Sequence, residues 1–181
     1  MDSAPRTIWT IGHSTHPLDV LVGLLRAQRI ECVADVRRFP GSRRHPQFGS
    51  EALAAGLPDA GIGYRHFGAL GGRRTPQPDS RNGVWRNAAF RGYADYMASA
   101  DYRAAFAALQ ALAREQRCAL LCAEVLWWRC HRSLIADDLV LHGWRVVHIL
   151  GNGHLTPHAF REPARLLDGV PVYGSGQAPL F

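Results

Sequence analysis

The sequence predicts an α/β fold: a single-domain, three-layer sandwich with a mostly parallel sheet of about five strands, built from two βαβ units. Three observations favour this class. Short apolar runs rich in β-branched residues recur along the chain. Segments with the apolar spacing of amphipathic helices separate them. Strand, helix and strand follow one another within about thirty residues, as parallel pairing requires. We expect this domain over residues 1–170 and a flexible tail over 171–181.

The first βαβ unit lies at the N-terminal end. Residues 7–11 alternate and are β-branched, which predicts a strand. Pro17 suits a first helical turn, and residues 18–29 have the apolar spacing of an amphipathic helix. Residues 30–36 then form a second buried strand in this interpretation.

The middle of the chain is richer in loops. Pro and Gly mark residues 38–48 as a loop, and a short helix follows over 50–60. Residues 62–67 are a candidate third strand, whereas 71–80 contain too many Pro and Gly residues for regular structure. Residues 88–116 are rich in Ala and predict two consecutive helical pieces.

The second βαβ unit begins with an apolar strand over residues 118–124. A turn and a helix that ends near residue 142 follow, and residues 144–150 supply the last strand. The chain after residue 151 is rich in Gly and Pro, and we expect one short helix near 162–167.

Composition narrows the functional classes. The 181 residues are 47% hydrophobic and 20% charged, as in an ordinary globular domain. No apolar run approaches the ~20 residues that cross a bilayer, so we expect no membrane association. The first five residues lack the basic and apolar regions of a secretory signal, which favours a cytoplasmic protein.

All 21 basic residues are arginine, and the formal net charge is +6. A guanidinium group binds phosphate and carboxylate bidentately, which points to an anionic small molecule or a nucleic acid as partner. A codon bias would explain the total count equally well. It does not explain why Arg37-Arg38, Arg43-Arg44 and Arg73-Arg74 all lie in turn-like sequence.

The four cysteines are too few and too scattered for a disulfide scaffold. Cys32 and Cys118 begin apolar runs and are interpreted as small core residues. Cys122 and Cys130 differ, because they bracket the turn between the fourth strand and the following helix.

Polar side chains follow several predicted strands. Because parallel strands end at one edge of the sheet, where ligands bind in open α/β folds, we expect these side chains to surround one pocket. A helix N-terminus at the same edge favours an anion. The predicted anion-binding residues are His13, Ser14, Asp35, Arg37, Arg43, Arg73, Arg129 and Arg132.

The same segments carry a family resemblance. Their motifs are Ile11-Gly12-His13-Ser14, Asp35-Val36-Arg37 with Pro40 and Ser42-Arg43, Pro46-Gln47-Phe48, Leu70-Gly71-Gly72, Cys122-Ala123-Glu124 and Cys130-His131-Arg132-Ser133. In order and spacing the sequence resembles the domain-of-unknown-function 488 family. The family usually has a Pro inside the last turn, where this chain has residues 125–128. The resemblance implies an α/β domain and supplies no established reaction.

Chemistry suggests roles for the residues around the turn. A thiol near a helix N-terminus and arginine side chains is nucleophilic, so Cys122 and Cys130 are both candidate catalytic residues. Glu124 or His131 would serve as acid or base.

Other interpretations remain open for the same residues. Asp35 with Arg37 or Arg132 is as well explained by a structural ion pair, and His13 by a bond to the neighbouring turn. A redox pair of the two turn cysteines is a lesser alternative. No C-x2-C or H-x3-H spacing is present, so we predict no metal and no cofactor.

The C-terminal sequence gives a separate indication. Gln177, Leu180 and Phe181 form a Gln-x-x-Leu-Phe pattern, similar to the peptide by which bacterial repair and replication proteins dock on the sliding clamp. The alternative is a tail that packs on its own domain. Two hypotheses follow: an anion-binding enzyme with a Cys/His/Arg pocket, and a non-catalytic nucleic-acid or DNA-repair-associated module that docks through this tail.

Overall fold

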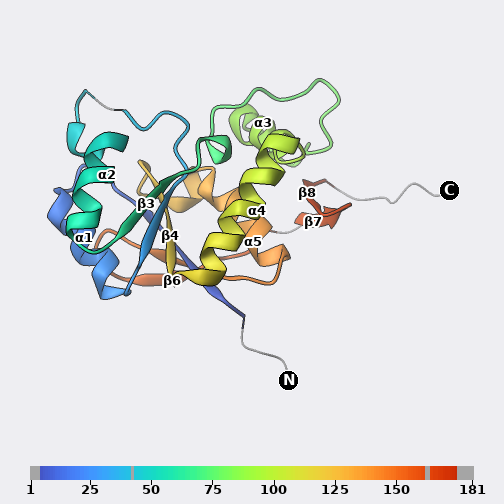
Figure 1. Ribbon diagram of the computed structural model, residues 1–181. Coiled ribbons are helices and arrows are strands. Elements are labelled where there is room, and N and C mark those ends of the chain that lie inside the picture. Colours follow the sequence, from blue (N-terminus) through green and yellow to red (C-terminus); the bar gives the residue numbers. More distant parts are fainter. Residues whose placement is uncertain (1–4, 42, 162–163, 175–181) are drawn as a thin grey trace.

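The computed structural model describes residues 5–41, 43–161 and 164–174. These residues form a mixed α/β fold with a six-stranded, mostly parallel sheet, a separate two-stranded sheet and five α-helices (Figure 1). The expected α/β class with a mostly parallel sheet is confirmed. Its finer description, a three-layer sandwich of two βαβ units, stays a prediction.

The large sheet has the strand order β3-β2-β4-β1-β5-β6. Its strands are β1 (Thr7–Gly12), β2 (Cys32–Asp35), β3 (Gly63–His66), β4 (Cys118–Cys122), β5 (Arg145–Ile149) and β6 (Leu155–Pro157). Strands β1 to β5 run parallel, and β6 pairs antiparallel with β5. The strands of each βαβ segment at the two ends of the domain are not neighbours: β4 lies between β1 and β2, and β1 lies between β4 and β5. Strands β2 and β3, which are joined through α2, pair directly.

The helices are α1 (Leu18–Ala27), α2 (Ser50–Asp59), α3 (Ala88–Tyr96), α4 (Ala100–Glu115) and α5 (Arg132–Leu141). Short 3-10 turns add η1 (Pro46–Phe48), η2 (Gly68–Leu70) and η3 (Trp127–Arg129). No helix of the described residues combines the length and apolar character needed to cross a bilayer.

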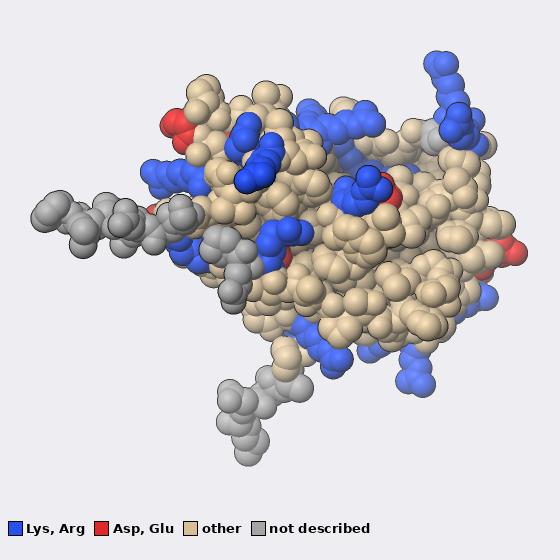
Figure 2. Space-filling model, turned by 180° about the vertical axis from the view of Figure 1, so that it is seen from behind, with Lys and Arg blue, Asp and Glu red and all other residues tan. Residues whose placement is uncertain are grey.

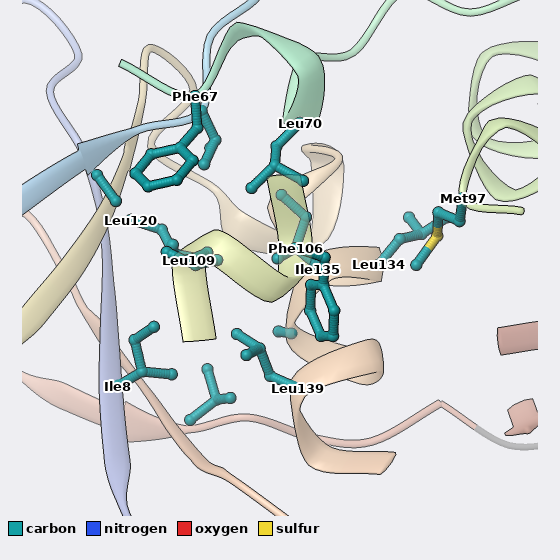
Figure 3. Close-up of a cluster of buried hydrophobic side chains, with 14 of the residues drawn as sticks. Ile8, Phe67, Leu70, Met97, Phe106, Leu109, Leu120, Leu134, Ile135 and Leu139 are labelled. Carbon is teal, nitrogen blue, oxygen red and sulfur yellow. The ribbon is translucent and has the colours of Figure 1, made fainter. Parts of the chain in front are cut away.

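Alternating strand residues divide the core into two clusters, as the two-residue period of a strand requires. One cluster contains side chains of β1 and β4 with Leu21 and Leu25 of α1 and Leu53 of α2. The other contains Ile8 and Leu120 with residues of α4 and α5 (Figure 3). The two clusters cover the two faces of the sheet, up to the edge where its parallel strands end.

The C-terminal part differs from the sequence prediction. Residues 164–167 are the strand β7 (Ala164–Leu167), which pairs with β8 (Val170–Tyr173), so the predicted short helix near 162–167 is wrong. The reason is the turn: Asp168 and Gly169 both have positive φ, 51° and 77°. Such a two-residue Asp-Gly turn matches the twist of a β-hairpin.

The predicted tail begins at residue 171, yet β8 includes residues 171–173, and Tyr173 is fully buried. Residues 175–181 lie outside the described residues. The clamp-like motif of Gln177, Leu180 and Phe181 falls within them, so it stays a prediction.

Candidate functional site

The ends of three neighbouring strands meet where the sequence predicted a pocket. The backbone N–H of His13, just after β1, donates to the Cys122 carbonyl at 2.9 Å. The N–H of Val36, just after β2, donates to the carbonyl of Leu121 at 3.0 Å. A Cβ at Gly12 would collide with the backbone of Glu124, so glycine is required for this approach. The end of β4 is therefore held between the ends of β1 and β2.

Two thiols and an imidazole lie together at this edge. Sγ of Cys122, Sγ of Cys130 and one ring nitrogen of His131 all lie within 4.8 Å of one another. Both cysteines are free thiols and are buried, and His131 is half-buried. Cys122 ends β4, while Cys130 and His131 immediately precede α5. We call these three residues the Cys/His cluster; they are also a set of side chains that could hold a thiophilic metal ion.

The orientation of His131 is fixed by the backbone just after β2. Its Nε2 lies 2.9 Å from the carbonyl oxygen of Val36, which accepts hydrogen bonds only. Nε2 therefore carries the proton, and Nδ1 of the neutral ring has the free lone pair. Nδ1 lies 3.6 Å from Sγ of Cys130, so the basic nitrogen faces the thiol.

The two thiols have opposite acidities. The hydrogen bond from the Cys122 thiol lowers the pKa of Cys130 well below its usual range, and the nearby His131 and Arg132 act in the same direction. That hydrogen bond, together with burial, raises the pKa of Cys122 well above its usual range. Because the thiolate is the reactive form of cysteine, this arrangement favours Cys130 as nucleophile.

Two adjoining cavities open onto the cluster. One, of about 330 Å³, is lined by Arg37, Arg38, Phe39, Gly41, Gly72, Arg73, Cys122, Ala123 and His131. The other, of about 340 Å³, is lined by Gly72, Arg73, Asn87, Ala89, Phe90, Tyr93, Cys122, Ala123, Glu124, Arg129, Cys130 and His131. They share the residues around Cys122 and His131, so a ligand in either one reaches the cluster. We call them the first and the second cavity.

Arg132 lies beneath the turn rather than in a cavity. Its side chain is 1% exposed and donates to the carbonyl oxygens of Glu124 and Val125 and to the hydroxyl of Thr10. None of the carboxylates that the structure describes forms an ion pair with it. The guanidinium therefore holds the turn and supplies a buried positive charge next to the thiols.

Arg37 is held by a buried carboxylate. Asp35 accepts two hydrogen bonds from this guanidinium, at 2.8 and 2.5 Å, and one from the Tyr64 hydroxyl at 2.7 Å. The structural ion pair that the sequence left open is thus present, between Asp35 and Arg37. The third nitrogen of Arg37 donates to Nε2 of His13 at 3.1 Å. Burial, and next the charge of Arg37, lower the pKa of His13 to about 4.

A chain of hydrogen bonds leads away from Arg132. The Thr10 hydroxyl contacts Nδ1 of His148 at 2.7 Å, and Nε2 of His148 contacts Nδ1 of His158 at 3.0 Å. Nε2 of His158 contacts the Asp137 carboxylate at 2.7 Å. One set of tautomers satisfies every member of this chain: the Thr10 hydroxyl donates to His148, His148 donates to His158, and His158 donates to the Asp137 carboxylate. The ring of Trp127 stacks on His148 at 4.1 Å, so the turn is packed onto this chain.

The structure brings together most, though not all, of the predicted site. The three predicted catalytic residues of the Cys/His cluster and Glu124 line the second cavity, as do Arg73 and Arg129; Arg37 lines the first. Five of the predicted site residues that the structure describes line neither cavity: His13, Ser14, Asp35, Arg43 and Arg132. His13 and Asp35 support Arg37 from below, Ser14 contributes its backbone N–H to Ala123 at 3.1 Å, and Arg43 is exposed.

Sequence reasoning missed two groups of residues. Asn87, Phe90 and Tyr93 of the α3 region line the second cavity, and nothing local marks them as neighbours of the turn. Asp137 and His158, in the buried chain, were also missed. Asp137 and Asp138, two adjacent acidic residues among the apolar residues of helix α5, were the available signal, since a buried carboxylate needs partners.

Comparison with known proteins gives one family match. The family model described as domain of unknown function DUF488 matches residues 17–139, from just before α1 into α5. The match includes the Cys/His cluster, Arg37 and Arg73, and it excludes His13 and His148. No curated protein and no solved structure gives a significant match. The match covers well over half of the chain, so this protein belongs to the DUF488 family.

Proposed function

We propose that this protein is an enzyme that binds an anionic, phosphate-bearing substrate in the two cavities and attacks it with the Cys130 thiolate, with His131 as the adjacent base. The observation that carries the proposal is the 3.6 Å approach of Cys130 Sγ to His131 Nδ1, with the opposite ring nitrogen bonded to a carbonyl. A nucleophile, a base within reach and a third group that orients the base are the recurring parts of covalent catalysis.

The charge of the cavity walls supports an anionic substrate. Arg73 lines both cavities, and Arg37, Arg38 and Arg129 line one each. Among the described residues that line them, Glu124 alone is acidic. Its carboxylate accepts the N–H of Leu126 at 3.2 Å. Several guanidinium groups around one space favour phosphate or carboxylate, because a guanidinium can offer paired donors. Arg37 contributes least to this, since Asp35 pairs with its charge and its nitrogens already donate to Asp35 and His13.

The proposed reaction assigns one role to each group. The exposed Arg73 and Arg129 orient the anion. Nδ1 of His131 takes the proton of the Cys130 thiol, and the buried charge of Arg132 stabilises the thiolate. The thiolate then bonds to the electrophilic atom, the leaving group departs with its electron pair, and His131 returns the proton to it. Cys122 stays protonated and donates to the Cys130 sulfur.

Two alkylating reagents test this proposal without knowledge of the substrate. Iodoacetate is anionic and iodoacetamide is neutral, and both label thiolates. On chelator-treated full-length protein, we expect Cys130 to favour iodoacetate, relative to a free thiol, by roughly tenfold, as one or two guanidinium contacts would provide. Inorganic phosphate should slow the labelling.

Arg73→Gln should reduce this preference, whereas Arg145→Gln serves as the matched control. Arg145 is exposed and begins β5, at the opposite edge of the sheet. Equal preference in all three proteins, or no labelling of Cys130 in the native state, would refute the proposal.

Nucleic-acid binding is a second candidate function, and the rim of the first cavity favours it. Phe39 is 68% exposed, and the Arg38 guanidinium lies 5.2 Å from its ring centre. An exposed aromatic ring next to arginines is suited to stack on a base beside a phosphate. The face shown in Figure 2 carries arginines at several separate places.

This candidate predicts salt-sensitive binding of a fluorescent single-stranded oligonucleotide that Phe39→Ala weakens. Docking on a sliding clamp through Gln177, Leu180 and Phe181 belongs to the same hypothesis, and deletion of residues 177–181 tests it. The hypothesis fails if the oligonucleotide is not bound at low salt.

A further inference from the structure

The donor atoms of the Cys/His cluster match a metal site better than the spacing in the sequence suggests. Two thiol sulfurs and one ring nitrogen converge within 4.8 Å although seven residues separate Cys122 from Cys130 in the chain. The strand end and the helix start bring them together, so a search for C-x2-C spacing misses them. Cysteine sulfur and imidazole nitrogen are the preferred ligands of Zn²⁺ and related thiophilic cations.

The histidine is in the tautomer that a metal needs. Nε2 of His131 donates to the Val36 carbonyl, and the lone pair of Nδ1 faces the sulfurs. Histidines that bind metals usually donate the other ring N–H to a carbonyl or carboxylate, which fixes the ring. The Val36 carbonyl, just after β2, supplies that partner without a metal.

Space remains for a fourth ligand. Cys122 and His131 line both cavities, so an ion among the three ligands faces solvent. A Cβ at Gly72 would lie only 3.0 Å from Nδ1 of His131, so the glycine keeps this nitrogen accessible. Three protein ligands with an open position are typical of zinc sites that exchange a water or a substrate.

A second thiol pair in the same protein provides a contrast. Cys32 and Cys118 lie opposite each other on β2 and β4 and are 4% and 0% exposed. They line neither cavity and have no imidazole nearby that completes a group of ligands. Within the described residues, the Cys/His cluster is the one place where three or more such ligands converge.

We propose that Cys122, Cys130 and His131 bind a thiophilic divalent cation such as Zn²⁺, with the fourth position open to the cavity, and that the bound ion blocks Cys130 as a nucleophile. Binding itself stands on the geometry of the cluster. The inhibitory consequence rests on the function proposed above: a sulfur that donates its electron pair to the metal is no longer free to attack a substrate.

Co²⁺ is the probe for binding, because thiolate ligands give it a charge-transfer absorption in the near ultraviolet. Chelator-treated full-length protein should show this band with a tetrahedral visible spectrum, saturating at one ion per chain, and Mg²⁺ should not compete. Cys122→Ser should abolish or strongly weaken the band, and Cys32→Ser should leave it unchanged. Gly72→Ala retains all three ligands and should weaken Co²⁺ binding by about tenfold or more through access to Nδ1.

Absence of the charge-transfer band, or a band that survives both Cys122→Ser and Gly72→Ala, would overturn the metal site. Labelling of Cys130 by iodoacetamide with and without Zn²⁺ separates the two proposals. If Co²⁺ binds but metal-free Cys130 is unreactive, the nucleophile fails and the metal site stands. If Cys130 reacts with the expected preference but no Co²⁺ band forms, the metal site fails and the proposed function stands.

Discussion

Acidification should destabilise this protein through one buried histidine next to the site. Nδ1 of His13 lies 2.8 Å from the carbonyl oxygen of Ser14, and Nε2 accepts from Arg37. Both ring nitrogens are thus committed in the neutral form, and the ring stacks on Phe48 at 4.1 Å. Protonation would place a second N–H against the guanidinium, with two positive charges in contact.

The magnitude follows from the lowered pKa. The pKa of His13 is lowered from the ordinary value of 6.5 to about 4 in the folded protein, mainly by burial. Above pH 6.5 the ring is neutral in both states and pH has no effect through it. As the pH falls from 6.5, only the unfolded chain binds the proton, so stability decreases until the folded state also titrates near pH 4. The full loss is about 3 kcal/mol, of which about 2 kcal/mol is reached by roughly pH 5.

Urea denaturation of the native protein and His13→Gln at neutral pH and near pH 5 measures this contribution. The variant has no titrating ring, so its free energy of unfolding should decrease by about 2 kcal/mol less than that of the native protein. His148, whose pKa burial lowers to about 2, contributes equally to both proteins and cancels. An equal acid sensitivity of the two proteins would refute the assignment of His13 as a buried neutral support of Arg37.

Three further substitutions test the site and its supports. Gly12→Ala should destabilise the fold by about 3 kcal/mol, because its Cβ would collide with the backbone of Glu124; an unchanged melting temperature would contradict this close approach. Tyr64→Phe removes the hydroxyl that donates to Asp35 and should cost about 1 to 2 kcal/mol in urea denaturation, whereas no loss would show that the bond is not formed. Arg132→Met leaves backbone carbonyls of the turn without donors and should cost about 2 to 4 kcal/mol and slow alkylation of Cys130; a variant that is as stable and as reactive as the native protein would exclude this role.

Much of the fold was predictable because its signals are local. The apolar runs at β1, β2, β4 and β5 are buried parallel strands, and such runs are recognisable from residue type alone. The order of the strands was not predictable, because the pairing of β4 between β1 and β2 joins segments far apart in the chain and leaves no local pattern in the sequence. The hairpin of β7 and β8 carried a local signal, Asp168-Gly169, which the sequence interpretation overlooked.

The candidate site was predictable as a location and less so as a set of roles. Knowing that parallel strands end at one edge was enough to place Cys122, His131 and Arg73 together. The role of Arg132 was not accessible, because α5 is buried over nearly its whole length and has no polar face to orient it. In the structure its guanidinium donates to the backbone of the turn from below, whereas the sequence interpretation placed it on the substrate side.

We infer that Cys130 is the reactive group of a cluster assembled from separate segments. Limited alkylation of the native, chelator-treated protein followed by peptide mapping tests it directly, because all four cysteines are free and buried and only their surroundings differ. We expect the first adduct to form on Cys130 and His131→Asn to slow its formation. A first adduct on Cys32, Cys118 or Cys122, or no adduct until the protein unfolds, would show that Cys130 is not the reactive thiol.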